Sequence, residues 1–426
     1  MEKKLPKGWV ETELREVVWS SKGKKPKRLE EYDFEGALPY LDILALEKGI
    51  IRQYADVNSS KVFSDNDIAI VWDGARSGWI FKTRKGVIGS TLCAISPKGF
   101  NVDFLYYYLL KEHQGININA RGVGIPHVDP TYLWSLKFNL PPLAEQERIA
   151  NKLDELFARV EVIKKSMDKI PQLLKDFRQQ VLTSAVTGKL TEEWREGKDL
   201  EEWKECKVND VLLDKPRNGF SPKAVEYITE VKSLALSATT SGRFNPVYVK
   251  YLDIPKPQKD SHLWLMKGDI LVQRSNSLEY VGTSAIYDGE NYDFIYPDIM
   301  MKLRVNTLIF NKMLYYILSC NKTKEYFRLN ASGTAGNMPK INQKIISDLL
   351  FLLPSLIEQE EIIKRVESLF IKADQIEEQY KALKEKIDIL PQLLLHKAFK
   401  GELVEQLPTD GDAAELLKEI MALKKK

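Results

Sequence analysis

The chain of 426 residues has room for two to four domains of ordinary size, and its 44% hydrophobic and 29% charged residues allow sizeable buried cores. The formal net charge of +3 is too small to indicate nucleic-acid binding by itself, so local charge has to be considered. Three separated cysteines exclude a disulfide framework or a zinc ribbon, and the lack of an apolar signal core or a membrane-length apolar run favours a cytoplasmic protein.

The first block, residues 1–139, is predicted to mix β-strands with short helices. The runs IAIVW (68–72) and GVIGSTLCAI (86–95) are rich in the β-branched residues that strands favour. The run DFLYYYLLKEHQ (103–114) is typical of a buried helix. Together these runs indicate a mixed α/β block.

Cationic side chains gather in the loops of this block. The segment SSKGKKPKR (20–28) has five positive charges and no acid, which suits phosphate contact but is equally common in a solvated loop. Two further loops, one after residue 72 and one at ARGVGIPHV (120–128), carry arginine, which can donate two hydrogen bonds to guanine. The candidate DNA contacts in this block are Lys22, Lys24, Lys25, Lys27, Arg28, Arg76, Arg121 and His127.

Motifs that would indicate catalysis are weak. DPTY (129–132) approaches the D-P-P-Y of adenine methyltransferases but lacks the second proline, and no glycine-rich cofactor turn is visible, so a turn at the start of a helix is the better interpretation. Pro297-Asp298 lacks the Glu-x-Lys that would complete a nuclease cluster, and there is no phosphate-binding loop of the G-x-x-x-x-G-K-[ST] kind. Four histidines without paired spacing do not make a metal site. We therefore predict no catalytic residues, no metal and no cofactor in this chain.

A repeated phrase divides the chain. Residues 140–149 read LPPLAEQERI, and residues 353–362, which lie 213 positions later, read LPSLIEQEEI. About fifty residues stay in register at this offset, so the chain contains an internal repeat. The predicted order is a first block (1–139), a long helix (140–190), a polar linker (191–202), a second block (203–352), a second long helix (353–403) and a C-terminal tail (404–426).

Both long helices are predicted to form a coiled coil, because apolar residues recur in steps of four and three. The proposed seam is Ile149, Leu153, Leu156, Val160, Ile163, Met167, Ile170, Leu174 and Phe177 in the first helix, and Ile362, Val366, Leu369, Ala373, Ile376, Tyr380, Leu383, Ile387, Leu390 and Leu394 in the second. We expect the two helices to pack antiparallel within one chain about a pseudo-twofold axis; the alternative is a coiled coil with another molecule. Kinks are expected at Pro171 and Pro391, and helix ends at Gly188 and Gly401.

The second block echoes the first. Trp9 reappears as Trp203, DNDIAIVWDGARSGW (65–79) resembles KGDILVQRSNSLEY (267–280), and ARGVGIPHV resembles ASGTAGNMPKI (331–341). The runs DILVQ (269–273) and GTSAIY (282–287) are strand-like, and FNKMLYYILSC (310–320) is helix-like. The candidate DNA contacts here are Lys215, Arg217, Lys223, Arg243, Arg274, Asn276, Asn337 and Lys340.

The order of two blocks and two helices, the phrase LPPLAEQERI / LPSLIEQEEI, and the helix ends SAVTGKL and KAFKGEL together resemble the specificity subunit of type I restriction–modification enzymes. The resemblance covers essentially the whole chain and implies an α+β fold of two target recognition domains separated by paired spacer helices. It also implies that each domain reads one half of a bipartite, asymmetric DNA sequence, while the helices set the gap between the halves.

The same resemblance implies partners. Two methyltransferase subunits would dock on the helices and restriction–translocation subunits would join them, bringing S-adenosylmethionine, ATP and Mg as cofactors. Around the start of each helix, the proposed partner interface is Glu145, Gln146, Glu147, Glu358, Gln359 and Glu360, although these residues could instead serve only to cap the helices.

Two other functions remain open from the sequence. One is a coiled-coil scaffold that pairs two ligand-binding domains without binding DNA. The other is an active methyltransferase that uses DPTY. The first predicts no sequence-specific DNA binding, and the second predicts that the isolated chain binds S-adenosylmethionine.

Overall fold

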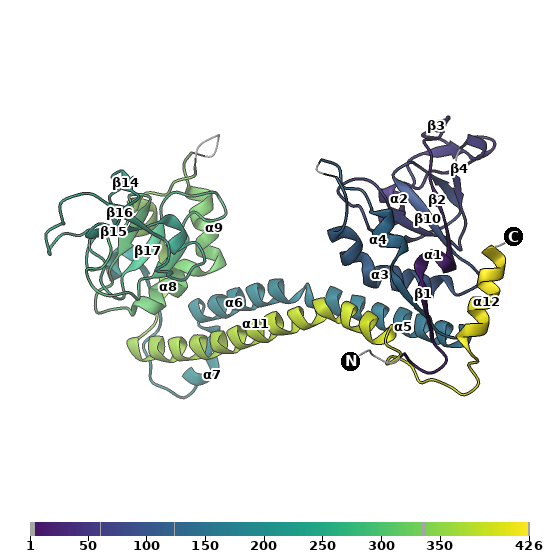
Figure 1. The fold of residues 1–426 in the computed structure, drawn as a ribbon. Helices are drawn as coiled ribbons and strands as arrows, with labels where there is room; N and C mark the ends of the chain where they lie inside the picture. The colour runs from purple at the N-terminus through teal and green to yellow at the C-terminus, as the bar shows by residue number, and fades with distance from the viewer. Residues whose placement is uncertain (1–4, 60, 123, 334–337, 425–426) are drawn as a thin grey trace. The chain divides into compact units, whose positions relative to one another are not determined.

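The structure, a computed structural model, describes residues 5–59, 61–122, 124–333 and 338–424. Its contacts divide the chain into two compact units, namely unit 1 (Met1–Asp168 and Ala382–Lys426) and unit 2 (Lys169–Lys381). Each unit holds one mixed α/β block and a part of each long helical segment (Figure 1). The predicted fold class, two mixed blocks with long helices between them, is confirmed. In the described part of the chain, no helix is both long enough and apolar enough to cross a membrane.

Unit 1 is built around a four-stranded antiparallel sheet in the order β2-β10-β7-β8. All four residues of the central strand β7 are buried, as the run IAIV predicts. The pairs β1-β11 and β6-β9 and the small sheet β3-β5-β4 accompany it. The strands are β1 Val10–Glu13, β2 Val18–Lys22, β3 Leu29–Glu30, β4 Ala37–Pro39, β5 Tyr54–Asp56, β6 Lys61–Phe63, β7 Ile68–Val71, β8 Ile80–Lys82, β9 Gly86–Ile88, β10 Leu92–Pro97 and β11 Lys137–Leu140. The helices are α1 Leu14–Val17, α2 Ile43–Lys48, α3 Val102–Ile118, α4 Pro130–Trp134, α5 Leu143–Met167 and α12 Ala413–Lys424.

The core of unit 1 joins the block to the long helices. Phe104 of α3 has its ring centroid 5.9 Å from that of Phe138 in β11 and 4.9 Å from that of Phe399, which follows α11. Ile149 and Leu153 of α5 belong to the same buried cluster. Since one core contains residues from both the block and the helices, the start of α5 is fixed to the block by packing.

Unit 2 repeats this plan with a sheet in the order β13-β19-β17-β18, accompanied by β12-β20 and β14-β16-β15. The strands are β12 Lys204–Lys207, β13 Arg217–Asn218, β14 Ala224–Val225, β15 Val231–Leu234, β16 Val249–Leu252, β17 Ile270–Gln273, β18 Ser284–Ile286, β19 Met300–Leu303 and β20 Leu350–Leu353. The helices are α6 Ile170–Val186, α7 Glu192–Arg195, α8 Asn311–Ser319, α9 Asn321–Asn330, α10 Gln343–Ser347 and α11 Leu356–Ala398, whose C-terminal part belongs to unit 1. The buried cluster of unit 2 includes Val181 of α6 and both Ile362 and Val366 of α11, so here too block and helices share a core.

The first long segment is broken and the second is not. Helix α5 ends at Met167 and α6 begins at Ile170, one residue before Pro171, where a kink was predicted. Helix α11 continues through Pro391. Gly188 and Gly401 have φ values of +79° and +72°, so both helical segments end at a glycine in the left-handed region, as predicted.

The long helices pair antiparallel inside each unit. In unit 1, Lys164 Nζ lies 3.2 Å from Asp388 Oδ1, while Asp168 faces Lys384, so the numbering rises in one helix as it falls in the other. In unit 2, Arg178 Nη2 donates to Asp374 Oδ1 at 2.7 Å. The expected intramolecular antiparallel pairing is confirmed.

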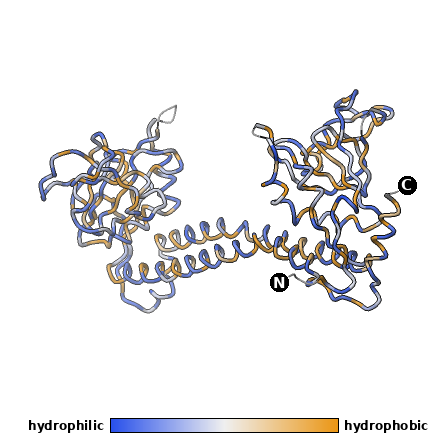
Figure 2. Tube along the Cα trace, viewed as in Figure 1, coloured by the Kyte–Doolittle hydropathy of each residue, from blue (hydrophilic) through white to orange (hydrophobic). Residues whose placement is uncertain are grey.

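Most of the predicted seam is at least half-buried, and Figure 2 shows hydrophobic positions recurring along these helices. Four seam assignments are wrong, because these side chains are 37–49% exposed: Ile163, Phe177, Ile376 and Leu383. Buried seam residues lie on both sides of these positions, namely Val160 and Met167 in α5 and Ala373 and Ile387 in α11. In this part of the helices only every second position of the predicted seam is therefore enclosed.

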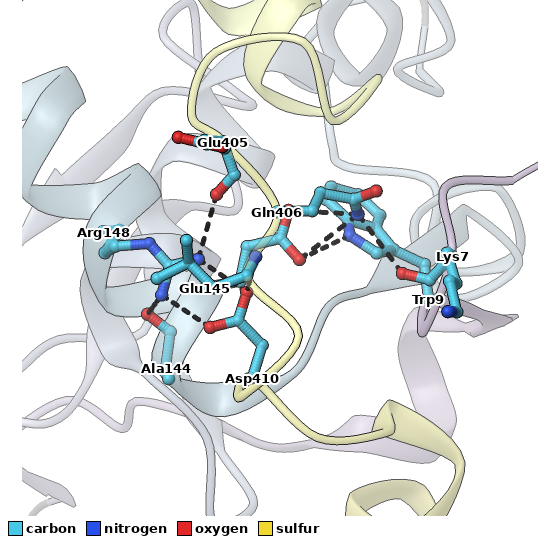
Figure 3. A network of polar contacts seen from close by, with 9 residues as sticks. Lys7, Trp9, Ala144, Glu145, Arg148, Glu405, Gln406 and Asp410 are labelled. Atoms are coloured by element: carbon cyan, nitrogen blue, oxygen red, sulfur yellow. Dashed lines mark hydrogen bonds and ion pairs between the residues drawn. The ribbon is translucent and has the colours of Figure 1, made fainter.

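The first glutamate of each repeated phrase accepts a hydrogen bond from a tryptophan at the start of its block. Glu145 Oε2 accepts a hydrogen bond from Trp9 Nε1 at 2.9 Å, and Gln406 Nε2 lies 3.4 Å from Glu145 Oε1 (Figure 3). Glu358 Oε2 accepts from Trp203 Nε1 at 2.8 Å in unit 2. Burial raises the pKa of Glu145, while these donors oppose the rise.

The glutamine of each phrase forms hydrogen bonds with backbone groups, one of which lies just before another helix. Gln146 Nε2 donates to Pro141 O at 2.7 Å, and Gln146 Oε1 accepts from Asn101 N–H, just before α3, at 3.0 Å. Gln359 Oε1 accepts from Phe310 N–H, just before α8, at 2.9 Å. Each Glu-Gln pair is thus a joint that fixes the first turn of a long helix to its block.

The segments that follow the long helices complete these joints. Arg148 donates to both carboxylate oxygens of Asp410, at 2.7 and 2.6 Å (Figure 3), and this hydrogen bonding lowers the pKa of Asp410. Ala413 N–H bonds to Gly8 O at 2.9 Å, and Ile420 of α12 is buried. In unit 2, Thr191 Oγ1 donates to Glu358 Oε1 at 2.6 Å. The residues predicted as tail and linker therefore include parts of the folded units.

These contacts correct part of the predicted partner interface. Glu145, Gln146, Glu358 and Gln359 are at most 1% exposed, and their polar atoms are used inside the chain. They hold the fold together and do not present a docking surface, so assigning them to a partner was wrong. Glu147 and Glu360 are exposed, and their role stays a prediction.

Replacing Gln146 tests the joint. The variant Gln146→Leu leaves Pro141 O and Asn101 N–H buried without their partner, which costs roughly 2–4 kcal/mol of unfolding free energy. Urea unfolding followed by tryptophan fluorescence measures the loss. Glu147→Leu, at an exposed neighbouring position, is the control and is expected to change stability by less than about 0.5 kcal/mol. Equal stability of the two variants would contradict the role of Gln146.

Candidate nucleic-acid interface

In unit 1, several predicted contacts gather at one end of the main sheet. We call this site the reading end of unit 1 and define it by Lys22, Trp72, Asp73, Arg121 and His127. Strand β7 leads directly into Trp72 and Asp73, and Lys22 ends β2. Arg121 and His127 exchange backbone hydrogen bonds of 2.8 Å in both directions, and Asp73 forms a β-bridge with His127. The loop between Arg121 and His127 is therefore anchored to the end of the sheet.

Asp73 organises the cations of this reading end. Its carboxylate lies 2.7 Å from His127 Nδ1 and 2.9 Å from Lys22 Nζ. Partial burial favours the neutral form of this carboxyl, but hydrogen bonds from His127 and Lys22 prevail and lower the pKa of Asp73. Lys22 Nζ also lies 5.9 Å from the ring centroid of Trp72. Because Lys22 and His127 remain about half exposed, they can reach a ligand while one acid holds them in place.

Arg121 is oriented by the first residue of DPTY. Its Nε lies 2.7 Å from Asp129 Oδ2, and Asp129 Oδ1 caps helix α4 by accepting from Thr131 N–H at 2.8 Å. The interpretation of DPTY as a turn at a helix start is confirmed. The Arg121 side chain also donates from Nη2 to Thr131 Oγ1 at 3.4 Å, but it is still 62% exposed, so its guanidinium remains accessible.

Other predicted arginines of unit 1 already have intramolecular partners. Arg76 Nη1 donates to Glu47 at 2.8 Å, and its guanidinium lies 4.8 Å from the ring centroid of Trp79. Arg28 lies 3.8 Å from the ring centroid of Phe34. Both arginines are half-buried or exposed, so nucleic-acid contact by them stays a prediction.

In both units, a glycine directly follows the strand that precedes the predicted basic loop. A Cβ on Gly23 would lie 2.1 Å from Gly89 O, and one on Gly219 would lie 1.9 Å from Tyr296 O. No larger residue fits at either position without moving the backbone. Lys24, Lys25 and Lys27 follow Gly23, and Lys223 follows Gly219, and all four are exposed.

Unit 2 has a reading end built in the same way, defined by Ser221, Arg274, Asn276, Asp298 and Lys340. Strand β17 leads into Arg274, and Lys340 forms β-bridges with Ser275 and Ser332. Asp298 Oδ1 accepts from Ser221 Oγ at 2.5 Å. Asn276 Nδ2 donates to Gln273 Oε1 at 2.6 Å, which fixes the orientation of its amide. The two loops of unit 2 are thus bridged at positions equivalent to those of unit 1, as the resemblance between the two blocks predicts.

Three predicted contacts of unit 2, Arg243, Lys215 and Arg217, lie elsewhere. Arg243 donates to both carboxylate oxygens of Asp374 in α11, so the structure assigns it to the junction with the helix. Lys215 and Arg217 line a separate polar cavity of about 390 Å³ together with Lys302, whose pKa burial lowers to about 8. Asn337 lies outside the described residues.

Several residues of these sites were missed from the sequence, namely Asp73, Asp298 and Gln273. Each is an acid or amide that holds another side chain by a hydrogen bond. Only the shared alignment of Asp73 with Ser275, both of them two residues beyond the strand end, could have drawn attention to this position. Among the described residues, no group of His, Cys, Asp and Glu side chains could hold a metal ion.

Comparison with known proteins agrees with this organisation. The family model described as the type I restriction modification DNA specificity domain matches residues 6–172 and 201–385, one copy in each half of the chain. The EcoKI specificity subunit of Escherichia coli K12 is 28% identical over 98% of this chain and 96% of its own length. The StySPI specificity subunit of Salmonella potsdam is likewise 28% identical over 98% and 96%.

Solved structures show the same fold. The HsdS subunit from Thermoanaerobacter tengcongensis superposes with a TM-score of 0.61 and 20% identity, covering 94% of this chain and 99% of that one. A chain from a structure on the assembly and conformational transition of a type I R-M system gives a TM-score of 0.67 with 19% identity, covering 94% and 100%. Because the family model matches most of the chain, this protein belongs to the type I restriction–modification DNA specificity family, as a DNA-recognition subunit and not as the catalytic component.

Proposed function

We propose that this chain binds a bipartite, asymmetric DNA sequence and that each unit reads one half. The supporting observation is that the two units share an arrangement. In each, a loop closed by a β-bridge lies beside the loop that follows the central strand, at the corresponding end of the main sheet. The side chains differ, with Trp72, Arg121 and His127 in unit 1 but Arg274, Asn276 and Lys340 in unit 2. Different side chains in equivalent places read different bases, so the two half-sites are unlike.

In this proposal, lysines set the position on DNA and other side chains read its bases. Lys22 and the exposed lysines after Gly23 suit phosphate contacts, which supply affinity without sequence preference. Arg121 and Arg274 suit guanine, and Asn276 suits adenine. Each of these three side chains is held by an intramolecular contact, which reduces the entropy lost on binding.

Lys22→Ala tests the phosphate contact. We expect DNA affinity to fall similarly for target and non-target duplexes, and the slope of log affinity against log salt to weaken by about one unit. Binding titrations at several salt concentrations measure both quantities for the complex with its methyltransferase partner. Lys137→Ala, which removes an exposed lysine paired with Glu11 in the separate strand pair β1-β11, is the control. An unchanged salt slope for Lys22→Ala would contradict phosphate contact.

A methyltransferase partner is proposed to dock on the long helices. Unit 2 has a cavity of about 760 Å³ lined by the start of α8 and by the exposed face of α11. Its lining includes Glu360, the partly buried Ile363 and the 57% exposed Ile371. An apolar floor with a charged rim is typical of protein interfaces. The methyltransferase, and any restriction subunit, would supply the sites for S-adenosylmethionine, ATP and Mg in a cytoplasmic complex.

Ile371→Glu tests this docking surface. A carboxylate on the apolar floor would have to be desolvated in the complex, so binding to the methyltransferase is expected to weaken by about tenfold or more. Size-exclusion chromatography with light scattering and calorimetry measure the association. Ile228→Glu, at an 82% exposed position of the block, is the control and should leave association intact. Equal affinity of the two variants would exclude this cavity as the docking site.

The paired helices are proposed to set the gap between the half-sites. Insertion of seven residues into α5 and seven at the facing part of α11, between Lys384 and Asp388, lengthens both helices by about 10 Å and preserves the antiparallel ion pairs. The tolerated gap is then expected to grow by roughly three base pairs at about 3.4 Å each. Long-read mapping of methylated sites in cells that express the variant with its methyltransferase measures the gap. A folded, active variant with the original gap would overturn the ruler.

A further inference from the structure

Unit 2 contains a chain of polar contacts that runs from its reading end to the long helices. At one end, Asn276 Nδ2 donates to Gln273 Oε1 at 2.6 Å. Gln273 is fully buried and turns its own amide towards the turn at residues 236–240, donating to Leu236 O at 3.0 Å and to Thr239 Oγ1 at 2.9 Å. A buried amide with both ends occupied has one orientation, so Asn276 and the turn are held relative to each other.

The same turn leads to the long helices within a few residues. Gly242 N–H bonds to Thr239 O at 3.0 Å, and Tyr315 Oη of α8 donates to Gly242 O at 2.8 Å. The next residue, Arg243, donates to Asp374 Oδ1 and Oδ2 at 2.9 and 3.0 Å. Arg243 therefore connects this turn of the block to α11 through one guanidinium nitrogen, Nη2, which is shared between both carboxylate oxygens of Asp374.

Asp374 is in turn fixed to the other helix of the pair. Arg178 of α6 donates to Asp374 Oδ1 at 2.7 Å and to Glu377 Oε2 at 2.9 Å. Partial burial favours the neutral form of Asp374, but its hydrogen bonds from Arg243 and Arg178 prevail and lower its pKa, so the acid remains charged at neutral pH. One carboxylate thus joins the block of unit 2 to both of its helices.

Unit 1 has a different residue at the centre of this arrangement. Val71 occupies the place of Gln273, because each is the last residue of its strand and each bonds to the backbone of the following hairpin in the same way. A valine has no polar atom with which to hold a neighbouring loop. The polar connection through Gln273 therefore belongs to unit 2.

We propose that Gln273, Arg243 and Asp374 are positioning residues that fix the reading end of unit 2 relative to the long helices, and that they thereby restrict the gap between half-sites. This inference rests on the proposed bipartite recognition and deepens it. None of the three residues needs to touch DNA. They determine how far the unit 2 reading loop can shift along the duplex when the gap is one base pair too long or too short.

The test measures gap selectivity in the complete complex with the methyltransferase. Duplexes carry the target defined by methylation mapping, with the natural gap or with one base pair more or less. Arg243→Met is expected to reduce the preference for the natural gap by about tenfold, as expected for loss of a charged hydrogen bond, with a smaller change in affinity for the natural target. Gln273→Met is expected to relax gap selectivity and also base preference in the unit 2 half-site, since Asn276 loses its partner.

Matched variants separate positioning from general damage. Lys256→Met removes another surface ion pair of the same block, with Glu230, and should keep wild-type gap selectivity. Arg243→Lys retains the charge and should restore part of the selectivity. Base preference in the unit 1 half-site should be unchanged in every variant. Thermal unfolding checks that the variants fold. If Arg243→Met does not fold, Asp374→Asn weakens the same contact from the acceptor side.

The outcomes are distinct. Folded Arg243→Met and Asp374→Asn complexes that keep the wild-type preference for the natural gap would overturn the positioning role and leave bipartite recognition standing. A wild-type complex without any bipartite target would instead overturn the proposed function, and this inference with it.

Discussion

The buried Glu-Gln pair at the start of each long helix is the contact on which the rest of this molecule depends. A carboxylate and an amide without exposure are costly unless every polar atom finds a partner. In each unit the partners come from sequence-distant places: the first tryptophan of the block, the residue before an internal helix, and the segment that follows the opposite long helix. Satisfying the pair therefore assembles these segments together and fixes the direction in which the helix leaves the block.

The buried framework of each unit is separate from the side chains at its reading end. The sheet, its glycine crossings and the joints are held by backbone and buried side-chain contacts. The side chains at the reading ends are half-buried or exposed and are held by single acids or amides such as Asp73 and Gln273. Changes among the outward-facing residues leave the core untouched, so the same fold can carry different side chains at these positions.

The sequence was informative wherever the chain repeats itself. The offset of 213 residues predicted two blocks, antiparallel helices and paired loops, because a repeat of this length requires equivalent structures. It misjudged Glu145 and Gln146 because charged and amide residues at a helix start are normally exposed, and only the three-dimensional environment shows them enclosed. It placed Arg243 with the DNA contacts because a lone loop arginine carries no sign of its partner, which here lies 131 positions away. Ile163 and Leu383 were assigned to the seam because a strict heptad makes every apolar position of the repeat a contact, whereas here the alternate positions Val160, Met167 and Ile387 are the buried ones.

Unit 1 is assembled from both ends of the chain, whereas unit 2 is one continuous stretch. The Ala413–Gly8 bond, the Arg148–Asp410 pair and the buried Ile420 all need residues from the last part of the chain. During synthesis the ribosome releases residues 1–168 first, but their core lacks Phe399 and α12 until all of unit 2 has been made. We therefore expect unit 2 to reach its native fold before unit 1, so that the half of the protein made first is the last to be finished.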